Sequence, residues 1–532
     1  MNGLGHMIEA LSAAQGARPA LIHGGRVMTY GELAVLSRRA AGGLGKIGIR
    51  RGDRVAFWLP NLPAYVVLLV ACARIGAVAV AVNTRFRASE VGDIVGRSGA
   101  KAIVLWPDFL GIPFRDILAD VDPAALARVQ ALIVYGEDDG GAGGGPHQPL
   151  PLPHARRIAY ETLIGAEPVA GDGNGADAFA IFTTSGTTKA PKFVLHRQRS
   201  IVDHARDVAD GFGYVRPATV LLQALPLCGV FGFCQAMSGL ASGAAMHMMP
   251  AFDAGQAVDI LQRERITQMN GADDMFMRMF AAAKGTRPFP HLRFCGFAAF
   301  ARTPAEMVAE GEARGVRFVG LYGMSEIQAL FARWSEDLPP ERRAQGGGVP
   351  VSPAASVRVR DPDSGRLLGA GAPGELEVKG PSLMAEYFGD AQATAAAFTD
   401  DGYLRTGDLG ELVEGGGFLF HTRIGDVLRL GGFLVSPAEI EAHLQTHAAV
   451  EVAQVVGVTT SAGPRAVAFV TLKAGAEFDE TALQAHCRRA MAAYKVPVRV
   501  IPLGDFPTTP SANGPKIQRA RLREMAARAM AT

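Results

Sequence analysis

The sequence predicts an α/β protein in three parts: a large N-terminal domain of doubly wound α/β layers, a β-barrel-like subdomain and a small α+β C-terminal domain. Helix-like and strand-like segments alternate from residue 30 to residue 106, which is typical of parallel, layered α/β architecture. Short strand-like runs separated by turns begin near residue 346, and a mixed unit follows residue 426.

The elements of the first part follow one another in a regular order. Apolar residues recur at helical spacing in 30–44, 64–76 and 88–99, and short apolar runs predict strands at 53–59, 77–82 and 101–106. A Gly/Pro-rich stretch at 138–153 is typical of a linker or surface loop. Beyond it, 179–183 and 317–322 predict strands of a second α/β region.

The later segments change in character. Residues 355–369, 374–380 and 417–423 predict antiparallel strands. In the last part, 437–447 and 480–493 predict helices, and 450–458 and 466–472 predict strands. This order predicts a compact α+β unit at the C-terminal end.

Composition narrows the class of protein. The 532 residues carry 53 Lys and Arg against 51 Asp and Glu, so charge gives no reason to expect nucleic acid as a partner. Five scattered cysteines without a C-x-x-C pair indicate a reducing compartment. No signal peptide is evident, and Arg74 interrupts the most apolar stretch, so we expect a cytoplasmic protein without a transmembrane segment.

Two patterns resemble binding motifs but fail their context. Gly43, Gly45 and Gly48 form a literal G-x-G-x-x-G, yet they follow a helical segment, whereas a dinucleotide site requires a preceding strand. His443 and His447 are spaced as metal ligands can be on a helix, but no third ligand is evident. A solvated helix face is the favoured interpretation of this pair.

The segment TTSGTTKAPK at 183–192 follows a predicted strand. A glycine-bearing turn lets backbone N–H groups converge on an anion, while Thr and Ser hydroxyls and lysine add further donors. The segment therefore predicts a phosphate-binding loop, with a polar surface turn as the alternative.

This loop resembles the signature loop of the adenylate-forming superfamily, which includes acyl-CoA synthetases, aryl-CoA ligases, luciferases and nonribosomal adenylation domains. Four further motifs occur in the family's order: YGMSE at 322–326, DGYLRTGDLG at 401–410, TRIGDVLRLGGFLVSPAEIE at 422–441 and PTTPSANGPKIQRARLR at 507–523. The resemblance covers essentially the whole chain. It implies an ATP-dependent enzyme that joins a carboxylic acid to AMP and then to a thiol, usually that of coenzyme A.

The resemblance also implies roles for individual residues. Tyr322, followed by Gly323, stacks on adenine, Ser325 bonds the α-phosphate, and Glu326 holds Mg²⁺, a cation that prefers oxygen ligands. Asp408 accepts hydrogen bonds from the ribose hydroxyls, and Arg423 contacts the ribose or phosphate. The residues expected around the β- and γ-phosphates are Thr184, Ser185, Gly186, Thr187, Thr188, Lys189 and Lys192.

The C-terminal unit carries the remaining implied roles. Lys516 is the expected catalytic lysine, bridging the substrate carboxylate and the α-phosphate. The implied domains are 1–425 and a small mobile domain 426–532, which rotates about a hinge at Asp426 between the two half-reactions. Gly431 and Gly432 then lie beside the pantetheine arm of coenzyme A, where glycine permits close backbone approach.

The sequence departs from the family pattern at several positions. Lys189 and Phe193 replace two loop glycines, and Gly229 stands where the family often has an aromatic residue or His. The predicted acyl pocket includes Cys228, Gly229, Val230 and Phe231, and this apolar segment lacks the Asp that pairs with an amino-acid substrate. We therefore expect an aromatic, alicyclic or medium-chain acid.

Three functions remain open at this point. The first is an AMP-forming carboxylic acid–CoA ligase using ATP, Mg²⁺ and coenzyme A. The second is an adenylating enzyme that passes its acyl group to a separate carrier protein or an amine. The third is a nucleotide-binding regulator without catalysis. The sequence leaves open whether the protein is a monomer or a homodimer.

Overall fold

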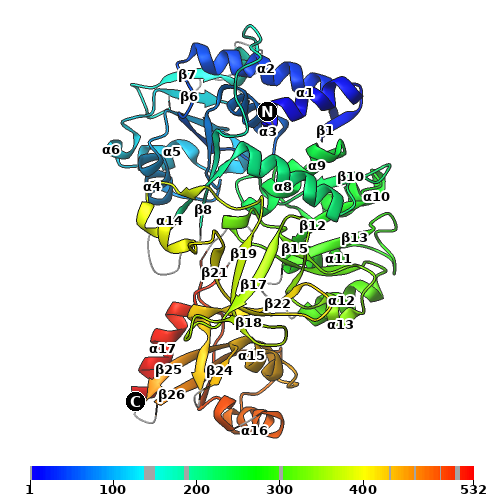
Figure 1. The fold of residues 1–532 in the computed structure, drawn as a ribbon, viewed down its shortest axis with the longest axis vertical. Coiled ribbons are helices and arrows are strands. Elements are labelled where there is room, and N and C mark those ends of the chain that lie inside the picture. The colour runs from blue at the N-terminus through cyan, green and yellow to red at the C-terminus, as the bar shows by residue number, and fades with distance from the viewer. Residues whose placement is uncertain are drawn as a thin grey trace.

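The computed structural model describes residues 3–136, 150–184, 191–298, 304–430, 433–460, 463–491, 493–509 and 516–531. Figure 1 shows the N-terminal layers (blue to green) at one end of the long axis and the C-terminal elements (orange and red) at the other. Two large sheets form the framework of the N-terminal part, one of 14 strands and one of eight.

The eight-stranded sheet contains most of the strands predicted in the first part of the chain. Its hydrogen-bonded order is β20-β9-β8-β4-β3-β5-β6-β7, so the chain starts near the middle and builds outward on both sides, as predicted for a doubly wound sheet. The strands are β3 (Arg54–Trp58), β4 (Val78–Ala81), β5 (Ala102–Leu105), β6 (Ala131–Val134), β7 (Arg156–Ala159), β8 (Ala178–Thr183), β9 (Phe193–Arg197) and β20 (Glu386–Tyr387).

Local signals explain where the neighbouring helices begin and end. The helix α2 (Tyr30–Lys46) starts at Thr29, which forms a capping box with Glu32. The helix α3 (Pro63–Ile75) has proline in its first turn and ends at Gly76, whose φ of +69° is the left-handed conformation that favours glycine. With α4 (Ala88–Ser98), these helices confirm the predicted alternation.

The 14-stranded sheet joins a parallel region to an antiparallel one. The parallel region comprises β1 (Pro19–His23), β10 (Val220–Gln223), β11 (Ala245–Met248), β12 (Gln268–Ala272), β13 (Phe294–Ala298) and β14 (Phe318–Tyr322), and β2 (Arg26–Thr29) pairs antiparallel with β1 at its edge. Its accompanying helices are α1 (Leu4–Gln15), α8 (Gln198–Gly211), α9 (Val230–Ser242), α10 (Ala254–Arg263), α11 (Asp273–Ala282) and α12 (Pro304–Ala313).

The antiparallel strands predicted beyond residue 346 are present and extend this sheet. The strands in the predicted ranges are β17 (Ser356–Arg360), β18 (Leu367–Leu368), β19 (Gly374–Lys379) and β22 (Phe418–Arg423). The same sheet also contains β15 (Ala332–Arg333), β16 (Gly347–Pro350) and β21 (Leu404–Leu412), which were not predicted. Through β15 and β16 their ladder continues directly from β14, so this subdomain shares its sheet with the preceding layer. This continuity brings the carboxyl end of β14 close to β21 and β22.

The C-terminal elements form small sheets of their own. A three-stranded sheet contains β25 (Val450–Thr460), β26 (Gly463–Leu472) and β27 (Arg499–Pro502), and short hairpins pair β23 (Leu428–Leu430) with β24 (Phe433–Val435) and β28 (Thr508–Thr509) with β29 (Lys516–Ile517). Its helices are α15 (Pro437–Gln445), α16 (Glu480–Ala490) and α17 (Arg519–Ala531). A separate hydrophobic core holds α15, α16 and the sheet together.

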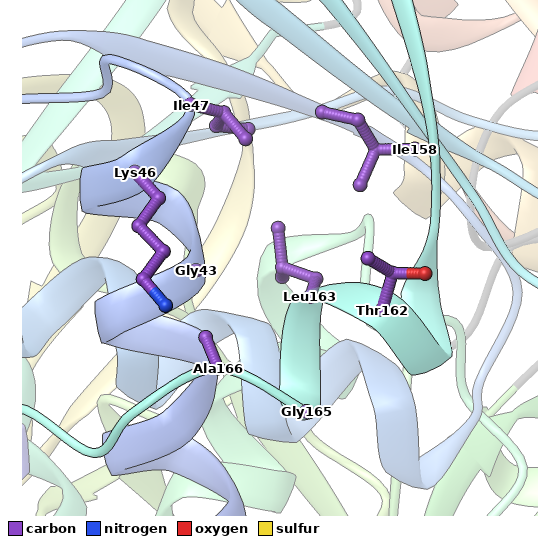
Figure 2. Close-up of a pocket in the computed structure, with 8 residues that line it drawn as sticks. All are labelled: Gly43, Lys46, Ile47, Ile158, Thr162, Leu163, Gly165 and Ala166. Carbon is purple, nitrogen blue, oxygen red and sulfur yellow. The ribbon is translucent and has the colours of Figure 1, made fainter.

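The two rejected motifs have structural roles. Gly43 and Gly45 lie in the last turns of α2, and a Cβ on Gly43 would come within 2.4 Å of the Leu163 carbonyl oxygen, so glycine there allows close packing. Gly43 lines a cavity at the end of α2 (Figure 2), which has a volume of about 280 Å³. None of the residues that line this cavity is a predicted site residue. His443 stacks on His486, and among the described residues no group of His, Cys, Asp and Glu has metal-binding geometry.

No helix in the described ranges is long and apolar enough to cross a membrane.

Candidate active site

The candidate site is built where β14, β21 and β22 meet. Tyr322 ends β14, and Asp408 and Arg423 lie opposite one another in the β21–β22 register. The Tyr322 hydroxyl donates to Asp408 Oδ2 over 2.7 Å, and Arg423 Nε lies 2.9 Å from Asp408 Oδ1. Three residues predicted to contact the nucleoside are thereby brought together.

Asp408 is a buried carboxylate with one unsatisfied oxygen. It is 3% exposed, and burial raises its pKa to about 6 although Arg423 partly offsets this effect. The Arg423 contact lacks hydrogen-bond alignment, so Oδ1 accepts no hydrogen bond from the described residues. A buried acceptor without a donor is unfavourable, and a ribose hydroxyl would satisfy it.

The residues before Asp408 fix its orientation. The Asp408 N–H donates to Thr406 Oγ1 over 3.0 Å, and the Thr406 hydroxyl donates to the Leu376 carbonyl over 2.6 Å. Between them, Gly407 has a φ of +69°, and its N–H donates to Glu375 Oε1 over 3.2 Å. The Thr-Gly-Asp motif is thus a bend in β21 that aims the carboxylate, and glycine provides the left-handed residue.

The segment after β14 presents Ser325 and Glu326. They are the first two residues of the short 3₁₀ helix Ser325–Ile327, and Glu326 is 7% exposed. Gly323 packs so closely on the following chain that a Cβ would lie 2.6 Å from the Ala329 Cα. The absence of a side chain at position 323 therefore lets the segment fold back on itself.

A chain of contacts connects Glu326 to the phosphate-loop hairpin. The Tyr387 hydroxyl donates to Glu326 Oε1 over 2.8 Å, and the Lys192 ammonium lies 4.2 Å from the centroid of the Tyr387 ring. Burial and the neighbouring Glu326 carboxylate raise the pKa of Tyr387, so its hydroxyl remains a donor. The predicted metal ligand and one predicted phosphate contact therefore share a partner.

The base of the predicted phosphate loop is a β-hairpin between β8 and β9. Thr184 N–H donates to the Lys192 carbonyl over 3.0 Å, and Lys192 N–H donates to Thr184 Oγ1 over 3.1 Å. This pairing closes the base of the loop. Ser185, Gly186, Thr187, Thr188 and Lys189 lie outside the described residues, so their contacts stay predictions.

Phe193, which replaces a family glycine, has a structural explanation. It is 2% exposed and packs in the core of the eight-stranded sheet. The guanidinium carbon of Arg97 lies 4.2 Å from its ring centroid. The substitution therefore adds a core contact at the start of β9.

The predicted acyl-pocket residues lie at the N-terminus of α9. Gly229 is the cap residue before the helix, followed by Val230 and by Phe231, which is buried. Cys228 packs partly buried against the apolar core, and burial raises the pKa of its thiol to about 12, which keeps the thiol protonated. These residues are apolar or small, and their role as an acyl pocket stays a prediction.

The structure describes some of the predicted site residues in the C-terminal part of the chain. The Lys516 backbone pairs with Thr509 in the β28–β29 hairpin, while its side chain and residues Gly431 and Gly432 lie outside the described residues. Asp426 ends a short 3₁₀ turn directly after β22 and forms an ion pair with Arg523 of α17. The predicted hinge thus lies at the start of the C-terminal elements.

Sequence reasoning missed several residues of this site. Thr406 lies in the motif that contains Asp408, but the hydrogen bond that it accepts from the Asp408 N–H was not predicted. Tyr387 lies 61 residues from its partner Glu326, a separation that no local pattern relates. His196 of β9 and His204 of α8 are also buried beside the segment that follows Tyr322. A single histidine in an apolar strand or a helix carries no sequence signal for such a contact.

Comparisons with known proteins agree with the family that the motifs resemble. The chain matches the AMP-binding enzyme family over residues 8–388 and the AMP-binding enzyme C-terminal domain over 439–513. It is 29% identical to the putative acyl-CoA synthetase YngI of Bacillus subtilis (strain 168), covering 98% of this chain and 96% of that protein. It is 30% identical to Triostin synthetase I of Streptomyces triostinicus, covering 98% and 94%.

Two further relatives extend the agreement to an aryl-CoA ligase and to a solved structure. 4-Coumarate–CoA ligase 3 of Oryza sativa subsp. japonica is 28% identical and is matched over 97% of this chain and 90% of its own. The crystal structure of ATP-bound MatB from Rhodopseudomonas palustris superposes with a TM-score of 0.84 at 26% identity, with full coverage of both chains. The match over most of the chain, and over its C-terminal part as well, confirms the family predicted from the motifs: the chain belongs to the AMP-binding enzymes of the adenylate-forming superfamily.

Proposed function

We propose that the protein is an AMP-forming carboxylic acid–CoA ligase that uses ATP and Mg²⁺. The observation that carries this proposal is the buried Asp408 carboxylate. Tyr322 donates to its Oδ2 and Arg423 lies beside its Oδ1, yet Oδ1 accepts no hydrogen bond from the described residues. A nucleoside with two adjacent hydroxyls supplies the donors that such a site requires. Family membership and relatives that are CoA ligases and synthetases support the same activity.

The described residues divide the chemistry of the first half-reaction among them. Asp408 accepts hydrogen bonds from the ribose, and the Glu326 carboxylate, oriented by Tyr387, offers an oxygen ligand to Mg²⁺. Ser325 and the Thr184–Lys192 hairpin provide donors for phosphate oxygens. Such fixed donors offset the repulsion between the attacking carboxylate and the triphosphate.

The second half of the machinery is assigned to the C-terminal elements. We assign 1–425 and 426–532 as the two domains, with Asp426 as the hinge, Lys516 as the adenylation lysine, and Gly431 and Gly432 beside the pantetheine arm. The separate C-terminal sheets and core support this division. Lys516 holds the carboxylate oxygen in line with the α-phosphate, and rotation about the hinge then admits the thiol.

The acyl substrate that fits best is an apolar carboxylic acid, whether aromatic, alicyclic or medium-chain. Phe231 and Phe233 are buried around the N-terminus of α9, and Phe233 packs edge-on to Phe182 at 5.0 Å. No carboxylate stands in 228–233 to pair with an α-ammonium group. The similarity to a 4-coumarate–CoA ligase supports an aromatic acid within this class.

A second candidate function differs only in the acyl acceptor. Triostin synthetase I is 30% identical, and its name is not that of a CoA ligase. An enzyme that adenylates its acid and transfers it to a carrier-protein thiol or an amine would use the same Asp408, Glu326 and Lys516. The acceptor must therefore be tested directly.

The test is one reaction analysed by mass spectrometry. It contains the purified protein, ATP, Mg²⁺, CoA and a pool of aromatic, alicyclic and fatty acids, with Asp408→Asn as a matched control of impaired nucleotide binding. An acyl-CoA product that is strongly reduced in the control establishes the ligase and identifies its acid. Acyl-AMP that accumulates regardless of CoA points to another acceptor, and nucleotide binding without either product favours a non-catalytic regulator.

A further inference from the structure

Two buried histidines contact the segment that carries Ser325 and Glu326. His196 of β9 is 0% exposed, and its Nε2 lies 2.8 Å from the Ser325 carbonyl oxygen. His204 of α8 is 1% exposed, and its Nε2 lies 2.9 Å from the Ala329 carbonyl oxygen. The two imidazoles therefore contact the segment near its two ends.

The segment between these contacts has an unfavourable backbone conformation. Gln328, Ala329 and Leu330 follow one another with φ values of +62°, +52° and +42°. Residues with a Cβ rarely adopt this left-handed region, because the Cβ comes too close to the following carbonyl oxygen. Such strain persists only where surrounding contacts fix the backbone, and it concentrates at functional sites.

Backbone and side-chain hydrogen bonds also hold this segment, including one from the Met384 N–H to the Glu326 carbonyl over 2.8 Å. The Gln328 N–H donates to the Ser325 carbonyl over 3.3 Å, the Ala329 N–H to the Met324 carbonyl over 3.0 Å, and the Phe331 N–H to the Tyr322 carbonyl over 3.0 Å. The Gln328 side chain donates to the Ser382 carbonyl over 3.0 Å. These bonds shape the turn, and the histidines connect it to β9 and α8.

The chemistry of the two contacts defines one tautomer. A carbonyl oxygen only accepts, so each Nε2 carries the hydrogen. Each Nδ1 is buried without a hydrogen-bond partner in the described part of the chain. Burial lowers the pKa of both imidazoles to about 4, which keeps them neutral at neutral pH. Both side chains therefore act as neutral donors.

We propose that His196 and His204 are positioning residues for the adenylation step. Their Nε2–H groups hold the two ends of the 325–330 segment, so that the Ser325 hydroxyl and the Glu326 carboxylate stay aimed at the phosphates and Mg²⁺. Neither histidine touches the nucleotide in this assignment, which rests on the proposed function. Because β9 also forms the base of the phosphate-loop hairpin, His196 connects that hairpin directly to Ser325.

Paired variants distinguish the effect of the Nε2–H donor from the effect of filling the same buried space. His196→Leu and His204→Leu remove the Nε2 donor, whereas His196→Gln and His204→Gln place an amide N–H near the same position. His247→Leu is the matched control, because His247 is also a buried strand histidine but contacts Glu264. Hydrogen exchange of the amides of Gln328, Ala329 and Phe331 reports the segment, and kinetics of acyl-AMP formation report its effect.

The expected result is a loss that the Gln variants reverse. Each Leu variant accelerates exchange at the three amides and lowers kcat of acyl-AMP formation about tenfold, with KM for the acid changed less than about threefold. The Gln variants recover most of both losses, and His247→Leu changes neither. Leu variants that match wild type, or Gln variants as impaired as Leu, overturn the proposal.

The exchange measurement also separates this inference from the proposed function. If wild-type protein adenylates no acid in the pool, the proposed function fails. Hydrogen exchange with and without ATP·Mg²⁺ does not depend on turnover. If the histidines hold the segment, its amides exchange slowly in the wild type and the Gln variants and faster in the Leu variants. Equal exchange in the wild type and in all four His196 and His204 variants rejects the positioning role, whether or not the protein turns over.

Discussion

Replacing Asp408 by Asn should stabilise the fold and weaken nucleotide binding. Burial raises the pKa of this carboxyl from its ordinary 3.8 to about 6, so keeping it ionised at pH 7 costs about 3 kcal/mol of folding free energy. The neutral Asn avoids most of that penalty and can still accept from the Tyr322 hydroxyl. ATP binding should weaken by about 1.5–3 kcal/mol, because the charged acceptor of the ribose hydroxyls is lost.

The stability difference between Asp408→Asn and the wild type should depend on pH in a direction that the raised pKa of Asp408 fixes. As pH falls from about 6 towards 4, Asp408 takes up a proton in the folded state before it does so in the unfolded state. The penalty of its charge then disappears, so the stability advantage of Asp408→Asn should be largest at pH 7 and shrink towards pH 4. Thermal unfolding midpoints at several pH values measure this difference, and isothermal titration calorimetry measures ATP affinity.

A nearby aspartate provides the matched control. Asp401 is exposed and pairs with Arg358, which holds the pKa of its carboxyl below the usual value. Asp401→Asn should therefore leave ATP affinity unchanged and give no stabilisation. A stability advantage of Asp408→Asn that is absent at pH 7 or constant with pH would refute the reasoning, as would unchanged ATP affinity.

Four further outcomes are expected. Lys516→Ala should reduce acyl-AMP formation at least about a hundredfold while sparing thioester formation from added acyl-AMP, as measured by separate half-reactions. Glu326→Gln should raise the Mg²⁺ concentration needed for half-maximal adenylation several-fold, a shift that excess Mg²⁺ partly restores. Gly323→Ala should lower the free energy of unfolding by about 1–3 kcal/mol, as measured by denaturant unfolding, because the added Cβ would lie 2.6 Å from the Ala329 Cα. The neutral His204, with a folded pKa of about 4 against an ordinary 6.5, stabilises the fold above pH 6.5 and loses about 2 kcal/mol by pH 5, a loss that should be absent in His204→Gln.

Much of the fold was predictable because its signals are local. Apolar spacing identified α2, α3 and α4 with their intervening strands, and Thr29 and Gly76 mark helix ends through capping chemistry that depends only on neighbouring residues. The ordered motifs identified the family and pointed to Tyr322 and Asp408. The same local reasoning correctly rejected Gly43 and Gly45 as a dinucleotide motif, because they continue a helix.

Other features depended on which strands become neighbours. The sequence predicted an antiparallel, barrel-like subdomain after residue 346, but it carried no signal that these strands continue the sheet that contains β14. Phe193 stands where the family has a loop glycine, and only its burial beside Arg97 shows that it is a core residue. Sheet register and side-chain packing decide such outcomes, and neither is encoded in a short window of sequence.

The sequence by itself identified the family and predicted the kind of site: a phosphate loop, an acidic metal ligand, a ribose-binding carboxylate and a distant lysine, each within a recognisable motif. Only the tertiary structure decided how the described residues are held. The Tyr322–Asp408, Tyr387–Glu326 and His196–Ser325 contacts join positions 86, 61 and 129 residues apart. A buried polar group must form a hydrogen bond, and in a closely packed interior its neighbours are set by the fold. Its partner can therefore lie far away along the chain.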